Sequence, residues 1–188
     1  MHLLHLSVLA LLLVSSTMGA VASADEVLQN GDFSEGLTHW EGDCRPLSVA
    51  TDSMARGAAV ELLSTWAKMT QNFEAKRGRY VISVTFTMTP DTTFEGGMPQ
   101  YRKIPKKLGF GDLTQFNLQR GEWCILVTNI AARRYDYCAI KPLKKDSAPQ
   151  TMTCEITLTR DDDEALFCLG FPPGHGVITL QNVSMTPK

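Results

Sequence analysis

The sequence has few residues of the kinds that bind transition metals or carry out catalysis. It contains no C-x-x-C pair, and beyond residue 24 its only histidines are His39 and His175, in separate predicted loops. A zinc-type site needs several such ligands close together, so we expect no metal site. A Gly-x-Ser-x-Gly nucleophile motif is also absent, and nothing else marks a catalytic centre. We therefore expect a protein that is not an enzyme.

A strong charge imbalance and a second long apolar run are missing as well. The net charge is −2, with acids and bases interspersed, which gives no reason to expect a nucleic-acid partner. The one long apolar run, "LLHLSVLALLLV", is followed by small residues up to Ala24. This pattern predicts a signal peptide over residues 1–24 and no membrane span after its cleavage. We expect one domain over residues 25–188, secreted or periplasmic.

Five cysteines follow the predicted cleavage site: Cys44, Cys124, Cys138, Cys154 and Cys168. An exported protein can oxidise them, and the odd number leaves at least one outside any intramolecular pair. Cys124 and Cys138 flank one predicted strand–loop–strand unit, so they are the first candidates for a disulfide. The alternatives for Cys154 and Cys168 are a bond to each other or burial as small apolar residues.

Apolar residues recur with a period of two, which indicates β-strands. In residues 80–89 one face carries Tyr80, Ile82, Val84, Phe86 and Met88, and residues 151–159 repeat the pattern. Further strands are predicted at 58–64, 67–73, 122–129, 165–171 and 176–185, and Leu28 is expected to begin a first strand. Turn signals separate these segments, among them "RDDDE" at 160–164, which we interpret as a solvated turn. This organisation predicts an all-β fold, an antiparallel sandwich or jelly roll.

One segment does not fit the strand pattern. Residues 91–121 form a long insert loop that is rich in aromatic and basic residues. Loops of this length are usually functional or disordered, and disordered segments are poor in aromatic residues. We therefore expect the insert to be ordered at least in part against the sandwich.

The stretch "NGDFSEGLTHW", residues 30–40, has several glycines and acids but lacks the patterns of known ligand loops. It has no Gly-Lys-Ser/Thr ending for a phosphate-binding loop and no EF-hand spacing of acids. It does resemble the N-terminal signature of family 4/9-type carbohydrate-binding modules. The segments "KRGRYVISVTFTM" and "QTMTCEITLTRDDDEALFCLGFPPGHGVITLQNVSM" are similar to later parts of the same pattern.

The resemblance implies a galactose-binding-like jelly roll that binds polysaccharide, usually beside a glycoside hydrolase. Sugar rings stack on exposed aromatic side chains and bind polar groups around them. The predicted ligand-binding residues are Trp66, Tyr101, Arg133, Arg134, Tyr135, Asp136 and Tyr137. Residues 133–137 lie in a segment where such modules often place a ligand-contacting loop. Trp40, Tyr80 and Trp123 are assigned to the core.

The resemblance also implies a structural calcium ion, but Gln181 stands where the family often has an aspartate. Asp32, Glu35 and nearby carbonyls are the remaining candidate ligands, so the calcium expectation is weak. Two alternatives to glycan binding remain open. One is an extracellular protein-interaction or envelope-associated module. The other is a hydrolase of glycosidic bonds, or an ancillary part of one.

Overall fold

The computed structural model describes residues 26–47, 56–64, 67–94, 125–131, 134–140 and 148–188, the two segments 125–131 and 134–140 by their backbone only. Within these residues no helix is long and apolar enough to cross a bilayer. The strands are β1 (Glu41–Gly42), β2 (Arg45–Pro46), β3 (Ala58–Glu61), β4 (Ala67–Ala75), β5 (Gly78–Met88), β6 (Thr93–Phe94), β7 (Ile125–Ala131), β8 (Arg134–Ile140), β9 (Gln150–Leu158), β10 (Asp162–Phe171), β11 (Gly174–His175) and β12 (Val177–Pro187).

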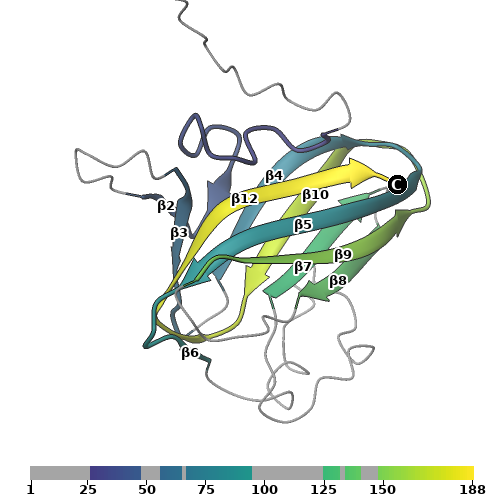
Figure 1. Ribbon diagram of the computed structural model, residues 1–188. Helices are drawn as coiled ribbons and strands as arrows, with labels where there is room; N and C mark the ends of the chain where they lie inside the picture. The colour runs from purple at the N-terminus through teal and green to yellow at the C-terminus, as the bar shows by residue number, and fades with distance from the viewer. Residues whose placement is uncertain (1–25, 48–55, 65–66, 95–124, 132–133, 141–147) are drawn as a thin grey trace, which may run out of the picture.

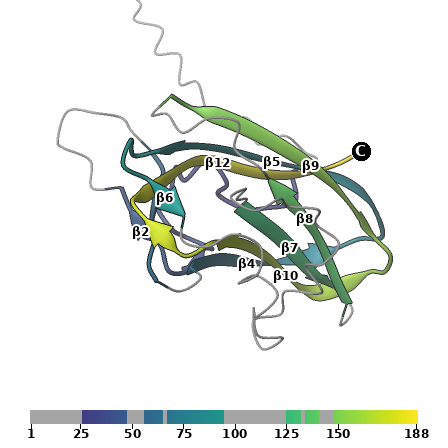
Figure 2. The ribbon, with the colours of Figure 1, turned by 90° about the horizontal axis from the view of Figure 1, so that it is seen from below.

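Two antiparallel sheets lie face to face (Figures 1 and 2). Sheet A has the strand order β1-β4-β10-β7-β8, and sheet B has the order β2-β3-β12-β5-β9. A two-stranded ribbon of β11 and β6 lies at one end of the sandwich. The all-β sandwich predicted from the period of two is confirmed.

The alternation in β5 decides which of its faces is buried. Tyr80, Ile82, Val84, Phe86 and Met88 are buried, while the residues between them are half-buried. Strand β9 continues this inner face beside β5, because Cys154 pairs with Ile82 and Ile156 with Tyr80. Cys154 and Ile156 therefore lie on the apolar face of the alternating pattern predicted for residues 151–159.

Strand β10 is the central strand of sheet A and lies between β4 and β7. Phe167, Leu169 and Phe171 are fully buried and point into the space between the sheets. The intervening Cys168 and Gly170, on the other face of the sheet, are buried too. The strand begins at Asp162 after a turn of exposed residues, as the interpretation of residues 160–164 as a solvated turn predicted, although the last residues of that segment already belong to the strand.

The N-terminal segment closes one end of the core without forming a strand. Leu28 is buried, but it lies in a series of turns rather than in the first strand that the sequence suggested. Trp40 packs on Phe33, with ring centroids 5.8 Å apart, and edge-on against Phe167 at 6.1 Å. Its indole Nε1 donates a hydrogen bond to the Asn30 carbonyl at 3.1 Å. Trp40 and Tyr80 are core residues, as predicted; Trp123 lies outside the described residues.

Gly31 allows this segment to lie directly on β12. Val183 N–H donates to the Gly31 carbonyl at 2.8 Å. A Cβ atom at position 31 would lie 1.9 Å from the Val183 carbonyl oxygen, so only glycine permits the approach.

Substituting Phe167 with alanine tests the importance of the contact between the sheets. The ring is fully buried, so Phe167→Ala should lower the free energy of unfolding by about 3–5 kcal/mol. Urea or guanidinium unfolding measures this change. Leu63→Ala is the control, because Leu63 is 48% exposed and its loss should cost no more than about 0.5 kcal/mol. Equal losses for the two variants would contradict the assignment of the core.

Candidate functional site

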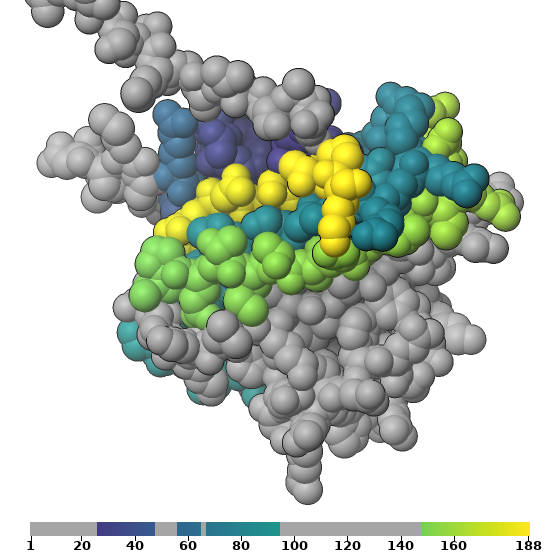
Figure 3. Space-filling model, turned by 45° about the vertical axis from the view of Figure 1, so that its right-hand side comes forward, coloured from purple at the N-terminus to yellow at the C-terminus, as the bar shows by residue number. Residues whose placement is uncertain are grey.

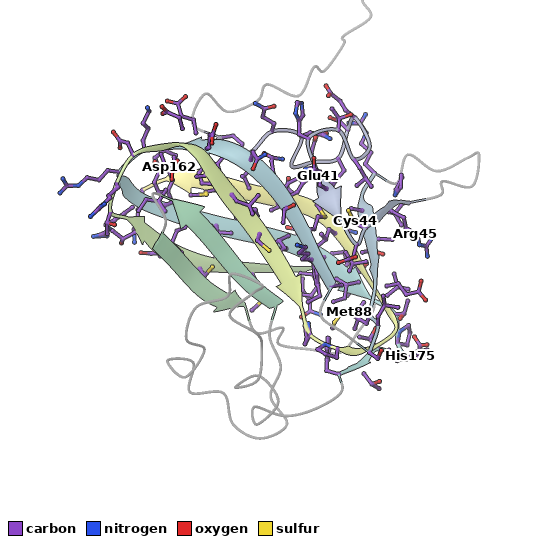
Figure 4. All side chains as sticks on the ribbon, turned by 180° about the vertical axis from the view of Figure 1, so that it is seen from behind. Glu41, Cys44, Arg45, Met88, Asp162 and His175 are labelled. Atoms are coloured by element: carbon purple, nitrogen blue, oxygen red, sulfur yellow. The ribbon has the colours of Figure 1, made fainter. Side chains whose placement is uncertain are left out.

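The outer face of sheet A is the surface that faces away from sheet B. Alternation along β10 places Leu166, Cys168 and Gly170 on this face, because Phe167 and Leu169 point inward. Figure 4 shows the molecule from behind, with the side chains that are described. Leu166 is half-buried and Cys168 is 4% exposed. The part of this face that β10 forms is therefore apolar and made of small or medium-sized residues.

The strand register places two of the predicted aromatic positions on this outer face. Residues directly opposite each other in an antiparallel sheet lie on the same face. Leu166 pairs with Ile130, and Ile130 pairs with Tyr135. Cys168 pairs with Thr128, and Thr128 pairs with Tyr137. Tyr135 and Tyr137 thus occupy successive outer-face positions on the edge strand β8.

Asp136 occupies the alternate position in the same strand. Its partner Asn129 pairs with Phe167, which points into the core. The segment around residues 134–140 is a regular strand, whereas the resemblance placed a ligand-contacting loop there. A strand separates its residues onto two faces, so Asp136 does not share a face with the two tyrosines.

Strand β4 adds exposed polar residues to the same outer face. Lys68, Asn72 and Glu74 are exposed. Asn72 pairs with Leu166, so it lies in the row of paired positions that continues across the sheet through Ile130 to Tyr135. Thr70 is nearly buried and donates from Oγ1 to the Glu41 carbonyl at 3.4 Å. A strand over residues 67–73 is predicted from the sequence, but no functional role is assigned there to its polar residues. Their alternation with Met69 and Phe73 was the available signal.

The outer face of sheet B has a different composition. Strands β12, β5 and β9 form it side by side (Figure 3), and hydroxyl side chains dominate it. The exposed Thr151 lies 2.8 Å from Thr85, Oγ1 to Oγ1, and Thr153 and Thr157 continue the row along β9. The described residues of this face include no aromatic side chain, so it offers hydrogen bonds but no platform for stacking.

The amide of Asn30 organises the candidate calcium loop. Nδ2 donates to the carbonyls of Gly36 at 3.1 Å and Thr38 at 2.9 Å, and Oδ1 accepts from Glu35 N–H at 3.0 Å. Asp32 Oδ1 accepts from Ser34 N–H, and its other oxygen lies 4.0 Å from Arg56 Nη1. No group of three His, Cys, Asp or Glu residues in the described part of the chain could hold a metal ion.

Several predicted residues cannot be placed. Trp66, Tyr101, Arg133 and Cys124 lie outside the described residues, as do the predicted signal peptide and the insert beyond Phe94. Arg134 begins β8 and Cys138 lies within it, both known by their backbone only. The register therefore places Tyr135 and Tyr137 on the same face of sheet A as the polar residues of β4, three strands away. All the predicted ligand contacts remain predictions.

Glu26 fastens the N-terminal segment to β12. Its Oε1 accepts from Met185 N–H at 2.7 Å and from Leu28 N–H at 3.2 Å, while Val27 N–H donates to the Met185 carbonyl. Burial raises the pKa of Glu26 above its ordinary value of 4.5, and the backbone N–H groups of Met185, Leu28 and Val27 oppose this change only in part. The carboxyl group is therefore a pH-sensitive link between the chain's first described residues and its last strand.

Comparison with known proteins identifies the fold. The sequence matches no protein-family model and no curated protein. Among solved structures, a family 16 carbohydrate-binding module matches with a TM-score of 0.54 at 12% identity, covering 85% of this chain and 99% of that one.

Two other modules have the same architecture. TmCBM61, solved with β-1,4-galactotriose, has a TM-score of 0.51 at 8% identity over 87% of this chain and 99% of its own. A family 22 xylan-binding domain from Paenibacillus barcinonensis has a TM-score of 0.51 at 9% identity over 84% of this chain and 91% of its own. The jelly roll of carbohydrate-binding modules is thus confirmed. The finer assignment to families 4 and 9 stays a prediction.

Replacing Asn30 with aspartate tests the role of its amide. The carboxylate keeps an acceptor for Glu35 N–H but loses both donors to Gly36 and Thr38. We expect Asn30→Asp to lower the free energy of unfolding by about 1–3 kcal/mol, measured by urea unfolding. Asn72→Asp makes the same chemical change at an exposed position of β4 and should cost no more than about 0.5 kcal/mol. An equal loss of stability in the two variants would show that the added negative charge, and not the loss of the two amide donors, lowers the free energy of unfolding.

Replacing Glu26 with glutamine tests the effect of its raised pKa. The folded state holds this proton to higher pH than the unfolded chain, so the Glu26 contribution to stability is greatest below pH 4.5 and is lost as pH rises through the folded-state pKa. Glutamine cannot titrate. The stability of Glu26→Gln relative to the parent should therefore increase between pH 4 and pH 7 in thermal unfolding. A relative stability that fell over this range would mean that the hydrogen bonds to the ionised carboxylate outweigh its burial.

Proposed function

We propose that this protein is a non-catalytic carbohydrate-binding module that binds a glycan chain on the outer face of sheet A. The observation that carries the proposal is the placement of Tyr135 and Tyr137 at successive outer-face positions of β8, in rows with the apolar residues of β10. The exposed Lys68, Asn72 and Glu74 of β4 supply polar groups on the same face.

The chemistry of this face suits a sugar ring. Pyranose rings present apolar C–H surfaces that stack on aromatic rings, while their hydroxyls need hydrogen-bond partners around the edge. Two tyrosine positions two residues apart on one strand lie about 6.5–7 Å from each other along the chain, a spacing suited to neighbouring sugar units. The outer face of sheet B lacks an aromatic side chain among its described residues, so sheet A is the better candidate.

The fold supports the same class of ligand. Two structural relatives with this architecture are carbohydrate-binding modules, one solved with β-1,4-galactotriose and the other described as xylan-binding. We propose that the ligand is a neutral β-linked polysaccharide. We also propose that the protein is exported and binds this polysaccharide outside the cell. A protein-interaction module and a glycoside hydrolase are the other outcomes that the experiment below separates.

Glycan binding should depend on the two tyrosines. We expect the purified protein to bind at least one soluble polysaccharide from a panel of xylan, β-1,4-galactan, mannan and mixed-linkage glucan, measured by affinity electrophoresis and titration calorimetry. Tyr135→Ala and Tyr137→Ala should each weaken binding roughly three- to tenfold or more. Tyr135→Phe and Tyr137→Phe keep the rings and should bind more tightly than the alanine variants.

The control is Thr153→Ala, on the outer face of sheet B, which should leave affinity unchanged. Equal weakening by Thr153→Ala would move the site to the other sheet. Failure of every glycan to bind, together with a protein that co-purifies with the chain in a tyrosine-dependent way, would favour the interaction module. Release of reducing sugar by the pure protein would overturn the non-catalytic assignment.

A further inference from the structure

The two edge strands β8 and β9 bring sheets A and B together on one side of the sandwich. Strand β8 is the last strand of sheet A and β9 the last of sheet B. The two strands have Cα atoms within 8 Å of each other (Figure 1). Facing sheets are usually about 10 Å apart, so this approach is close for two strands that belong to different sheets.

Cys154 of β9 is bonded in a disulfide. Its position faces the interior, because it pairs with Ile82, which is fully buried, and its side chain packs partly against the core. A partner for Cys154 must therefore come from the interior side of a neighbouring strand. A disulfide also needs Cα atoms about 4.4–6.8 Å apart, which limits the partner to a segment adjacent to β9.

Cys138 of β8 meets these requirements by its backbone position. It pairs with Val127, which pairs with Leu169, and Leu169 points into the core. Position 138 therefore belongs to an interior row of sheet A. It lies two residues before the end of β8, and Cys154 lies four residues after the start of β9, the next strand in the chain.

Cys44 and Cys168, the two other cysteines in the described part of the chain, do not meet these requirements. Cys44 is a free thiol between β1 and β2, the first strands of the two sheets, on the side of the sandwich opposite to β8 and β9 (Figure 4). Cys168 lies on the outer face of sheet A, with the sheet between it and the interior where Cys154 lies. Cys124 lies outside the described residues, and the peptide mapping below tests it as the alternative partner.

We propose that Cys154 is joined to Cys138, and that this disulfide ties sheet B to sheet A along the β8–β9 edge. The pairing takes the place of the Cys124–Cys138 bond expected from the sequence. Each thiol gives up one hydrogen, and the two electrons pass to a disulfide-bearing oxidant, which is reduced to a dithiol. The bond supplies a second attachment for β8, whose backbone pairs only with β7 among the described strands.

Peptide mapping tests the pairing directly. The protein is denatured without reductant, its thiols are alkylated, and it is digested with trypsin. Cleavage after Arg and Lys, except at the Lys141–Pro142 bond, places Cys124, Cys138 and Cys154 on separate peptides, residues 121–133, 135–144 and 146–160. We expect 135–144 linked to 146–160 in mass spectrometry. A link from 121–133 to either of the other peptides, or no linked peptide, would overturn the proposal.

Thermal unfolding of cysteine variants gives a second, independent test. Cys138→Ser and Cys154→Ser should lower Tm by similar amounts, on the order of 5–10 °C, and the double variant should lose no more than either single variant. Cys44→Ser is the control on the opposite side of the sandwich and should leave Tm nearly unchanged. Additive losses in the double variant would contradict a shared bond. None of these measurements depends on glycan binding.

Discussion

The contact between the inner faces of sheets A and B is the interaction on which the rest of the structure depends. Neither sheet has a helix over it in the described part of the chain, so each inner face is buried by the other sheet and, at one end, by the N-terminal turns. Phe167 of sheet A and Phe86 of sheet B are both fully buried in this space. Trp40 extends the same core under the N-terminal turns through its contact with Phe167. Because apolar burial is the main favourable term in folding, this layer determines where every other element lies.

The same alternation that fills the core also determines the character of the two outer faces. In sheet B it exposes threonine and serine, as in the row that begins with Thr151. In sheet A it combines the apolar Leu166 with exposed polar residues of β4 and with two tyrosine positions on β8. A glycan needs both an apolar platform and polar groups at its edge, and only one of the two faces combines them. The difference between the faces is the structural basis of the proposed function.

The two sides of the sandwich are held in different ways. On one side, β1 of sheet A and β2 of sheet B follow each other in the chain with only Asp43 and Cys44 between them, so covalent connection keeps the sheets together. On the other side, β8 and β9 are also consecutive in the chain, but the nine residues 141–149 lie between them, and each has one hydrogen-bonded neighbour among the described strands. Edge strands have unpaired backbone groups and fewer contacts to hold them. The proposed disulfide lies at this side, within the strand that carries the tyrosine positions, and it would give β8 a covalent link to β9.

The sequence by itself determined the fold class, because strand periodicity is a local property: side chains of alternate residues in β5 and β9 must point to opposite faces whatever surrounds them. It also identified Trp40 and Tyr80 as core residues and Tyr135 and Tyr137 as candidate ligand contacts. It did not give β8 a strand range of its own, since "RRYDYC" is polar and has no continuous apolar face, although a strand–loop–strand unit was predicted between Cys124 and Cys138. It also placed Leu28 in a strand where the chain turns. Only the tertiary structure decided which strands are neighbours, and therefore which residues share a face. The rows that join Asn72 to Tyr135, and the approach of β8 to β9, depend on strand order and register, which are set by contacts between residues far apart in the chain.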